Sequence, residues 1–147
     1  AGKKGFSVIA IEKDMMNSEI GFGRKVLEVL ENHKICFEHL PSGIDTMSVV
    51  VNDNDFLPVK DTVIADIQKK TKPDNITIYN GIALVAVVGR GMAGSKGTAS
   101  RLFKAIANSD INIRMIDQGS SELNIIVGVA EEDYVKTLEA IYNEFVK

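Results

Sequence analysis

The sequence predicts an α+β fold built from two ferredoxin-like βαββαβ units in tandem, each an antiparallel sheet with helices on one face. Two observations support this prediction. First, residues 5–51, moved along by 76 positions without a gap, align with residues 81–127. Such an internal repeat indicates one supersecondary unit present in two copies. Second, compact apolar runs, typical of strands, alternate with apolar residues at helical spacing.

In the first copy, the apolar period sets the order of the elements. Asn17 and Ser18 are frequent N-cap types and predict that the first helix begins near residue 19. Pro58 is tolerated in the first turn of the second helix. The predicted elements are strand 6–11, helix 19–32, strands 35–40 and 47–51, a helix that begins at 52–55 and buries Val59, Val63, Ile64 and Ile67, and strand 76–79.

The second copy repeats this order but lacks its last element. Its predicted elements are strand 82–88, helix 96–107, strands 111–116 and 123–127, and helix 131–145. Lys147 aligns with Thr71, so the counterpart of strand 75–79 is missing from this copy or comes from elsewhere. The expected domains are therefore residues 1–80 and residues 81–147.

The composition is that of a globular protein, with 45% hydrophobic and 25% charged residues and a net charge of -3. This mildly acidic balance disfavours nucleic acid as a partner, because phosphate binding depends on clustered Lys and Arg. No stretch is long and apolar enough to span a membrane, and no leader is apparent, so we expect a cytoplasmic protein. The single Cys36 is interpreted as a packing residue. His33 and His39 have no companions at ligand spacing, so no metal site is expected.

Two motifs carry a resemblance to a known family. The segment 118–125, Gln-Gly-Ser-Ser-Glu-Leu-Asn-Ile, resembles the second ACT repeat at the C-terminus of aspartate kinases. The segments 16–23 and 39–45 resemble the first ACT repeat of the lysine-sensitive type. The resemblance implies that this chain is a regulatory region and not itself an enzyme. It also implies an upstream kinase domain, absent here, that would hold ATP and Mg²⁺, and no cofactor in these residues.

The residues themselves point to a site for a small zwitterion. Each copy places a loop before a helix N-terminus, where free N–H groups and the helix dipole favour a carboxylate. Gly21 and Gly23 permit close approach of a ligand to the backbone. Glu38 is a candidate acceptor for an ammonium group, and Phe22 a candidate cover for an aliphatic stem.

The resemblance adds specific positions for an amino-acid effector, and a carboxylate at Glu19 favours lysine among the candidates. Threonine and S-adenosylmethionine remain possible. For each position a purely structural role stays open: glycines that relieve crowding, Met16 and Phe22 as core residues, Glu19 and Glu38 as surface charges. The expected effector-binding residues are Met16, Glu19, Gly21, Phe22, Gly23, Phe37, Glu38 and Gly43.

ACT proteins of this kind pair edge strands between subunits, which implies a homodimer with the effector near the interface. The candidate edge strands are 35–40 and 111–116, since unpaired edges need a cover. The candidate interface residues after the second of these strands are Gln118, Gly119, Ser120 and Ser121.

Two other functions stay open. Gly89, Gly91 and Gly94 match the G-x-G-x-x-G pattern of dinucleotide-binding proteins, which needs a parallel βαβ unit. Here a short turn joins the next two strands and predicts antiparallel pairing. The remaining alternative is a purely structural oligomerisation module.

Overall fold

The computed structural model describes residues 1–121 and 124–146, with the Arg90 side chain left out, and it divides into two compact units. The first unit is Phe6–Asn80. The second unit combines Ala1–Gly5 with the described residues from Gly81 onward. Two long strands, β1 (Gly2–Glu12) and β4 (Asn75–Val88), pass from one unit into the other.

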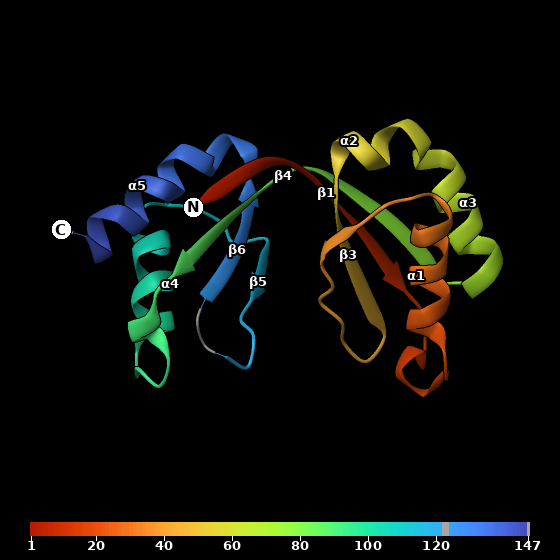
Figure 1. Cartoon of the computed structure of the whole chain (residues 1–147), viewed down its shortest axis with the longest axis horizontal. Coiled ribbons are helices and arrows are strands. Elements are labelled where there is room, and N and C mark those ends of the chain that lie inside the picture. Colours follow the sequence, from red (N-terminus) through yellow and green to blue (C-terminus); the bar gives the residue numbers. More distant parts are fainter. Residues whose placement is uncertain (122–123, 147) are drawn as a thin grey trace. The chain divides into compact units, whose positions relative to one another are not determined.

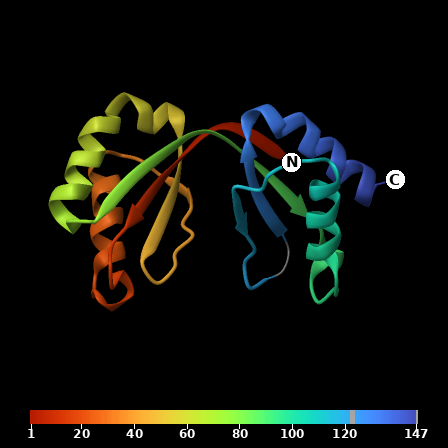
Figure 2. The same ribbon diagram turned by 180° about the vertical axis from the view of Figure 1, so that it is seen from behind.

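The first unit has the predicted βαββαβ order (Figure 1, red to yellow-green). Between β1 and β4 lie η1 (Met16–Ser18), α1 (Phe22–Asn32), β2 (Phe37–His39), β3 (Thr46–Asn52), α2 (Asp53–Phe56), η2 (Leu57–Val59) and α3 (Lys60–Thr71). The strand order is β2-β3-β1-β4, and β3 is antiparallel to both β1 and β2. Helices α1 and α3 pack side by side on one face of this sheet in both views (Figures 1 and 2).

The core of the first unit lies between that helix pair and the sheet. Ile9 and Ile11 alternate on β1, and Val63 and Ile67 on α3 face them at helical spacing, all four fully buried. Phe56, at the end of α2, is also fully buried. Burial of these side chains supplies the main driving force for the unit, because each large apolar group contributes about 1.5–3 kcal/mol.

The second unit repeats the architecture (green to blue in Figure 2). After β4 come η3 (Arg90–Met92), α4 (Thr98–Asn108), β5 (Met115–Asp117), β6 (Asn124–Ala130), η4 (Glu131–Asp133) and α5 (Tyr134–Phe145). Both β4 and β5 are antiparallel to β6. Leu102 and Ile106 of α4 and Val127 and Val129 of β6 are fully buried in its core.

The fourth strand of the second unit comes from the N-terminal end of the chain. Ala86 donates its backbone N–H to the Ala1 carbonyl at 2.8 Å, and the Ala1 nitrogen donates to the Ala86 carbonyl at 3.2 Å. Gly5 N–H bonds to Glu131 Oε1 at 3.2 Å, and the Lys4 ammonium lies 5.5 Å from the centre of the Tyr134 ring. Residues 1–5, expected in the first domain, therefore lie with the second unit.

Several expected boundaries differ from the structure. Helix α1 begins at Phe22, three residues later than predicted, because a 3-10 turn occupies residues 16–18 and neither Asn17 nor Ser18 caps the helix. The predicted strands 35–40 and 111–116 shorten to β2 and β5. Cys36 is exposed, so its interpretation as a packing residue is wrong.

Parts of two predictions lie outside the described residues, namely Glu122 of the 118–125 motif and Leu123, which belongs to that motif and to the predicted strand 123–127. Among the residues that the structure describes, no helix has the length and apolar character needed to cross a membrane.

Candidate effector site

The candidate site is the loop of the first unit that joins β1 to α1, residues 13–21. Met15 takes a left-handed conformation with φ 61°, and the η1 turn follows directly. Gly21, with φ 85°, then starts α1, and no side chain caps this helix end. A glycine suits this position because a left-handed φ is costly for other residues. The helix therefore begins at the loop without a capping side chain from Gly21, and its first N–H, that of Phe22, bonds to the Glu19 carbonyl at 3.3 Å.

Two lysines, Lys13 and Lys25, connect the loop to neighbouring elements through Glu19. Lys13 Nζ donates to Glu19 Oε1 at 2.6 Å and to the Thr71 carbonyl at 2.7 Å, which links the loop to the C-terminal end of α3. Lys25 Nζ lies 3.7 Å from Glu19 Oε2. The Lys13 ammonium also lies 5.7 Å from the centre of the Phe22 ring. Together these contacts fix the position of both the loop and the first turn of α1.

This arrangement sets the charge state of Glu19. The hydrogen bond from Lys13, together with the positive charges of Lys13 and Lys25, holds the pKa of the Glu19 carboxyl below its usual value near 4.5. Glu19 is therefore a carboxylate that already has two ammonium partners. Of the two, Lys25 is the more distant and the easier to replace.

A second group of acidic residues contacts the start of the loop. Asp74 Oδ2 accepts the Asp14 N–H at 2.7 Å, and Asp45 Oδ1 accepts the Met15 N–H at 3.1 Å. Together with Glu12 they line a cavity of about 240 Å³. Sequence patterns alone did not single out these residues as part of a site, although Asp45 lies inside the 39–45 motif that carries the family resemblance.

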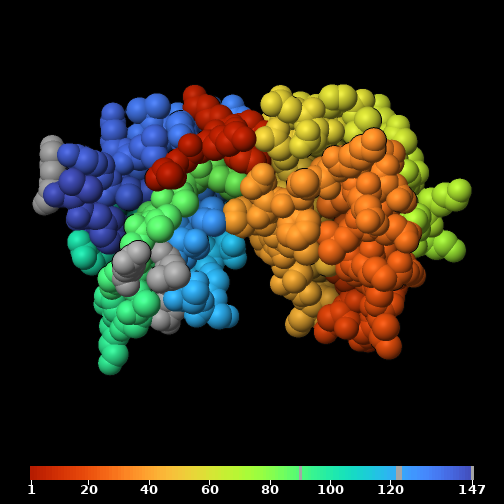
Figure 3. Space-filling view, in the orientation of Figure 1, coloured from red at the N-terminus to blue at the C-terminus, as the bar shows by residue number. Residues whose placement is uncertain are grey.

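The structure brings most of the predicted effector residues to this loop but shows that two of them are core residues. Met16 and Phe22 are almost fully buried, at 5% and 3% exposure, and belong to the core of the first unit. A Cβ added to Gly23 would contact Met47 Cε at 3.4 Å, which places the start of β3 beside α1. The surface formed by residues 13–23, the loop and the start of α1, appears in red-orange in Figure 3.

The other predicted effector residues lie across the sheet. Phe37 and Glu38 are exposed on β2, and β3 separates them from β1. Gly43 lies in the turn before β3, where its N–H bonds to the Thr46 carbonyl at 2.8 Å. The loop between β1 and α1 bonds to this turn through Asn17 N–H and the Ile44 carbonyl at 3.0 Å. Gly43 is thus connected to the loop, whereas Phe37 and Glu38 lie on the edge strand.

The predicted interface segment follows β5 in the second unit. Gln118, Gly119, Ser120 and Ser121 are all exposed there. Strand β2, beside β3, and strand β5, beside β6, are the two terminal strands of the strand order β2-β3-β1-β4-β6-β5, so the two strands expected at edges are found at edges.

The equivalent loop of the second unit has different chemistry. The 76-residue shift places Gly89, Ser95 and Arg101 where the first unit has Lys13, Glu19 and Lys25. Arg101 instead bonds to Glu144 at 2.9 Å and lies 4.7 Å from the centre of the Phe145 ring. Among the side chains that the structure describes, the positions equivalent to Lys13, Glu19 and Lys25 therefore do not repeat the charged network in the second unit.

The antiparallel pairing of β4 and β5 with β6 also bears on the Gly89, Gly91 and Gly94 pattern. A dinucleotide site of that type needs a parallel βαβ unit, and the strands on either side of α4 are both antiparallel to β6, which separates them. Among the described residues, no group of three or more His, Cys, Asp or Glu side chains is placed to hold a metal ion. The Nε2 atom of His33 instead lies 2.6 Å from Oδ2 of Asp66.

Two consecutive βαββαβ units are the architecture of a pair of ACT domains. The sequence model of the ACT domain family matches residues 85–145, in the second unit. Aspartokinase 3 of Bacillus subtilis is 40% identical over 146 residues, which are 99% of this chain and 32% of that protein.

Solved structures agree. The aspartate kinase of Clostridium acetobutylicum has 52% identity and a TM-score of 0.96, with 99% of this chain and 34% of that chain covered. The regulatory subunit of aspartate kinase from Thermus thermophilus shares the fold at 22% identity and a TM-score of 0.84, over 99% of this chain and 95% of its own. Aspartokinase III of Escherichia coli shares the fold at 21% identity and a TM-score of 0.77, with 99% of this chain and 32% of that chain covered.

The chain is a tandem ACT regulatory region of the aspartate kinase family. It spans about a third of the length of the full-length relatives that it matches. It matches regulatory subunits along nearly their whole length, and not a catalytic kinase domain.

Proposed function

We propose that this region binds a free amino acid at the loop between β1 and α1 of the first unit and so regulates an aspartate kinase activity that resides in the rest of a longer protein. The observation that carries the proposal is the uncapped start of α1 directly beside the Lys13, Glu19 and Lys25 network. The N–H groups of the first helical turn and the positive end of the helix dipole suit the ligand carboxylate. We assign ATP and Mg²⁺ to the kinase part, and we expect the whole protein in the cytoplasm.

Lysine is the effector that we propose. Escherichia coli aspartokinase III, similar in fold, has been solved in complex with lysine and aspartate. In this chain, the ε-ammonium of a bound lysine would replace Lys25 beside Glu19 Oε2, because the 3.7 Å contact is the weaker of the two. The α-ammonium requires acceptors, and the carboxylates of Asp45 and Glu38 are the candidates from the turn and the edge strand.

Feedback inhibition requires that the effector favours one arrangement of subunits. We propose a homodimer formed through the edge strands β2 and β5, with Gln118, Gly119, Ser120 and Ser121 at the junction. A strand edge offers unpaired backbone groups that a second copy satisfies. Coupling of about 1–3 kcal/mol between effector site and kinase site is typical of such linkage.

Thermal unfolding with added ligands separates this proposal from its alternatives. A ligand that binds only the folded state raises the Tm with its concentration. Lysine, threonine, S-adenosylmethionine and NAD are titrated in parallel. A rise with an amino acid supports the regulatory function, whereas a rise with NAD alone supports dinucleotide binding. A Tm that no ligand changes favours a structural oligomerisation module.

A further inference from the structure

The two oxygens of the Glu19 carboxylate in the first unit have partners of unequal strength. Oε1 accepts a hydrogen bond from Lys13 Nζ at 2.6 Å, and Lys13 is held further by its bond to the Thr71 carbonyl. Oε2 lies 3.7 Å from Lys25 Nζ, which is longer than a hydrogen bond. Among the residues that the structure describes, Glu19 is the ionic partner of Lys25. One side of the carboxylate is therefore firmly bound, whereas the other holds an ammonium group by charge alone.

The Lys25 ammonium can leave this position without any change in the backbone. The Lys25 N–H bonds to the Gly21 carbonyl at 3.0 Å, so the start of α1 fixes the backbone of this residue. The Lys25 side chain is 37% exposed, against 23% for Lys13. A lysine side chain is a strongly hydrated ammonium on a flexible four-carbon stem. Rotation of this stem is enough to move the ammonium from Glu19 into water.

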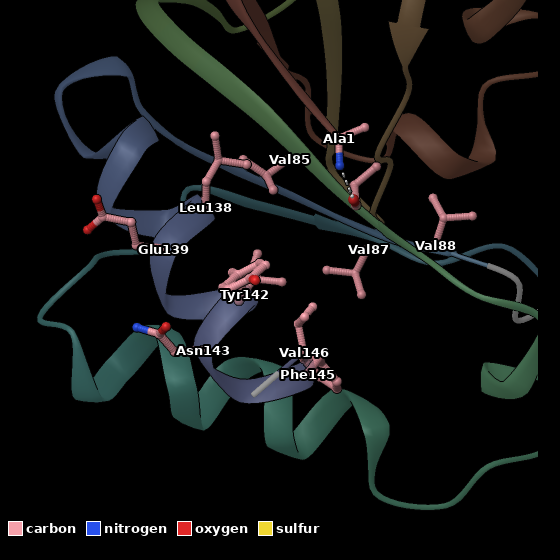
Figure 4. A pocket seen from close by; sticks show the side chains of 12 residues that line it. Ala1, Val85, Val87, Val88, Leu138, Glu139, Tyr142, Asn143, Phe145 and Val146 are labelled. Atoms are coloured by element: carbon pink, nitrogen blue, oxygen red, sulfur yellow. Dashed lines mark hydrogen bonds between the residues drawn. The ribbon is translucent and has the colours of Figure 1, made fainter.

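The second unit shows where a basic side chain at this helix position goes when the loop offers no glutamate. Arg101 occupies the position of Lys25, and a serine that of Glu19. Arg101 bonds to Glu144 of α5 at 2.9 Å and lies 4.7 Å from the centre of the Phe145 ring. Phe145 in turn lines an apolar groove of about 670 Å³ between β4 and α5 (Figure 4). This contrast indicates that the loop carboxylate, and not the helix, directs the Lys25 side chain.

Charge decides between displacement of Lys25 and addition of a third ammonium group. The depressed pKa of Glu19 keeps it ionised at neutral pH, so two ammonium groups and one carboxylate leave this cluster with an excess of positive charge. Another cationic side chain beside Oε2 would bring two ammonium groups into close proximity, where like charges repel. Release of Lys25 keeps the charge of the cluster unchanged. A cationic effector side chain therefore takes the place of Lys25 and does not join it.

We propose that Lys25 is a tethered competitor of the effector, and that its ammonium stays beside Glu19 Oε2 until a cationic ligand displaces it into water. This inference rests on the proposed function and adds a regulation of the same site: Lys25 raises the ligand concentration at which the first unit is filled. The tether keeps the competing ammonium close to the carboxylate at every ligand concentration. An effector with a neutral side chain has no group for Oε2 and leaves Lys25 in place.

The test measures lysine binding by calorimetry in the 147-residue chain, in Lys25→Met and in Arg24→Met. Lys25→Met should bind lysine about three- to fivefold more tightly, because the tethered ammonium no longer occupies the site. Arg24→Met removes the same charge from the neighbouring position, which pairs with Glu28, and should bind lysine as the parent chain does. Norleucine, which has the stem of lysine without the ammonium, should gain nothing from Lys25→Met.

Three results would overturn the inference alone. Equal lysine affinity in the parent chain and in Lys25→Met would show that Lys25 does not compete. Weaker binding in Lys25→Met would make Lys25 a contact of the ligand, and an equal gain in Arg24→Met would assign the effect to the overall charge. Absence of lysine heat from all three chains would instead contradict the proposed function, and the inference with it, so the two failures are distinguishable.

Discussion

The ammonium of Lys13 lies 2.6 Å from the carboxylate of Glu19, across the loop that joins β1 to α1. The same ammonium bonds to the Thr71 carbonyl, so one side chain connects the loop to the end of α3. The second unit has glycine and serine at the equivalent positions. The two units therefore share a fold but differ in the charges at this loop, which is why we place the effector in the first unit.

Replacement of Lys13 by methionine should lower the free energy of unfolding, since a charge-assisted hydrogen bond and the partner of the Thr71 carbonyl are both lost. The midpoint of urea unfolding measures this loss. Arg24→Met is the matched control and should lower the midpoint clearly less, because its pair with Glu28 is solvent-exposed and involves no backbone carbonyl. Equal losses in both variants would contradict this role for Lys13.

The depressed pKa of Glu19 predicts a pH dependence. The hydrogen bond from Lys13 lowers the pKa in the folded state, so the stabilisation is fully present above the unfolded value near 4.5 and is lost as the pH falls through the folded value. Glu19→Gln should therefore lose stability at pH 7 and show a flatter decline below pH 4.5. Chemical unfolding between pH 3 and 7 tests this. A decline as steep as that of the parent chain would show that Glu19 does not contribute to the loss of stability at low pH.

Two neighbouring glycines should respond in opposite directions to alanine. Gly21 has a left-handed φ of 85°, so Gly21→Ala should cost about 1 kcal/mol. Gly23 lies inside α1 with room for a Cβ at 3.4 Å from Met47, so Gly23→Ala should stabilise the helix by about 0.5–1 kcal/mol. Gly97→Ala, with the same φ of 85°, should repeat the Gly21 result in the second unit. Denaturation midpoints that move together for Gly21 and Gly23 would refute the argument.

Glu38 should matter for binding and not for folding. It is exposed on the edge strand β2, so Glu38→Ala should leave the Tm within about 1 °C of the parent value. If Glu38 accepts the effector ammonium, the same variant should lose effector binding in calorimetry. Glu31→Ala, an exposed charge on α1, is the control and should bind normally. Unchanged affinity in Glu38→Ala would remove this residue from the site.

Removal of residues 1–5 should loosen the second unit selectively. The deletion takes away the ladder bonds to Ala86, the Gly5 bond to Glu131 and the Lys4 contact with Tyr134. Hydrogen exchange should accelerate at Ala86 and along the neighbouring part of β4, while the amides of α1 and α3 stay protected. Deletion of Ala1 alone should affect only the end of this ladder. Equal exchange in the full and the shortened chain would contradict the strand assignment.

The repeat and the apolar periods were sufficient to predict the architecture, because Ile9, Ile11, Val63 and Ile67 show in the sequence which faces are buried. The origin of the fourth strand in the second unit was not predictable. Residues 1–5 are polar and glycine-rich, with no strand pattern of their own, and their role is revealed by the bonds of Ala1 to Ala86 and of Gly5 to Glu131.

The candidate site was predictable in part. The loop and the glycine that starts α1 follow from the sequence, but the partners of Glu19 do not, because Lys13 and Thr71 come together only through the packing of α3. The start of α1 was misplaced for a related reason. Asn17 and Ser18 look like caps in the sequence, whereas the structure uses the left-handed Gly21.

Isothermal titration calorimetry with lysine, threonine and methionine shows whether the first unit binds an amino acid and which one. We expect saturable heat with lysine, and loss of that heat in Glu19→Gln but not in Arg101→Gln, which changes the equivalent loop of the second unit. Clear heat with threonine or methionine and none with lysine would contradict the choice of effector. Binding of lysine that survives Glu19→Gln and disappears in Arg101→Gln would place the site in the second unit and contradict the proposal.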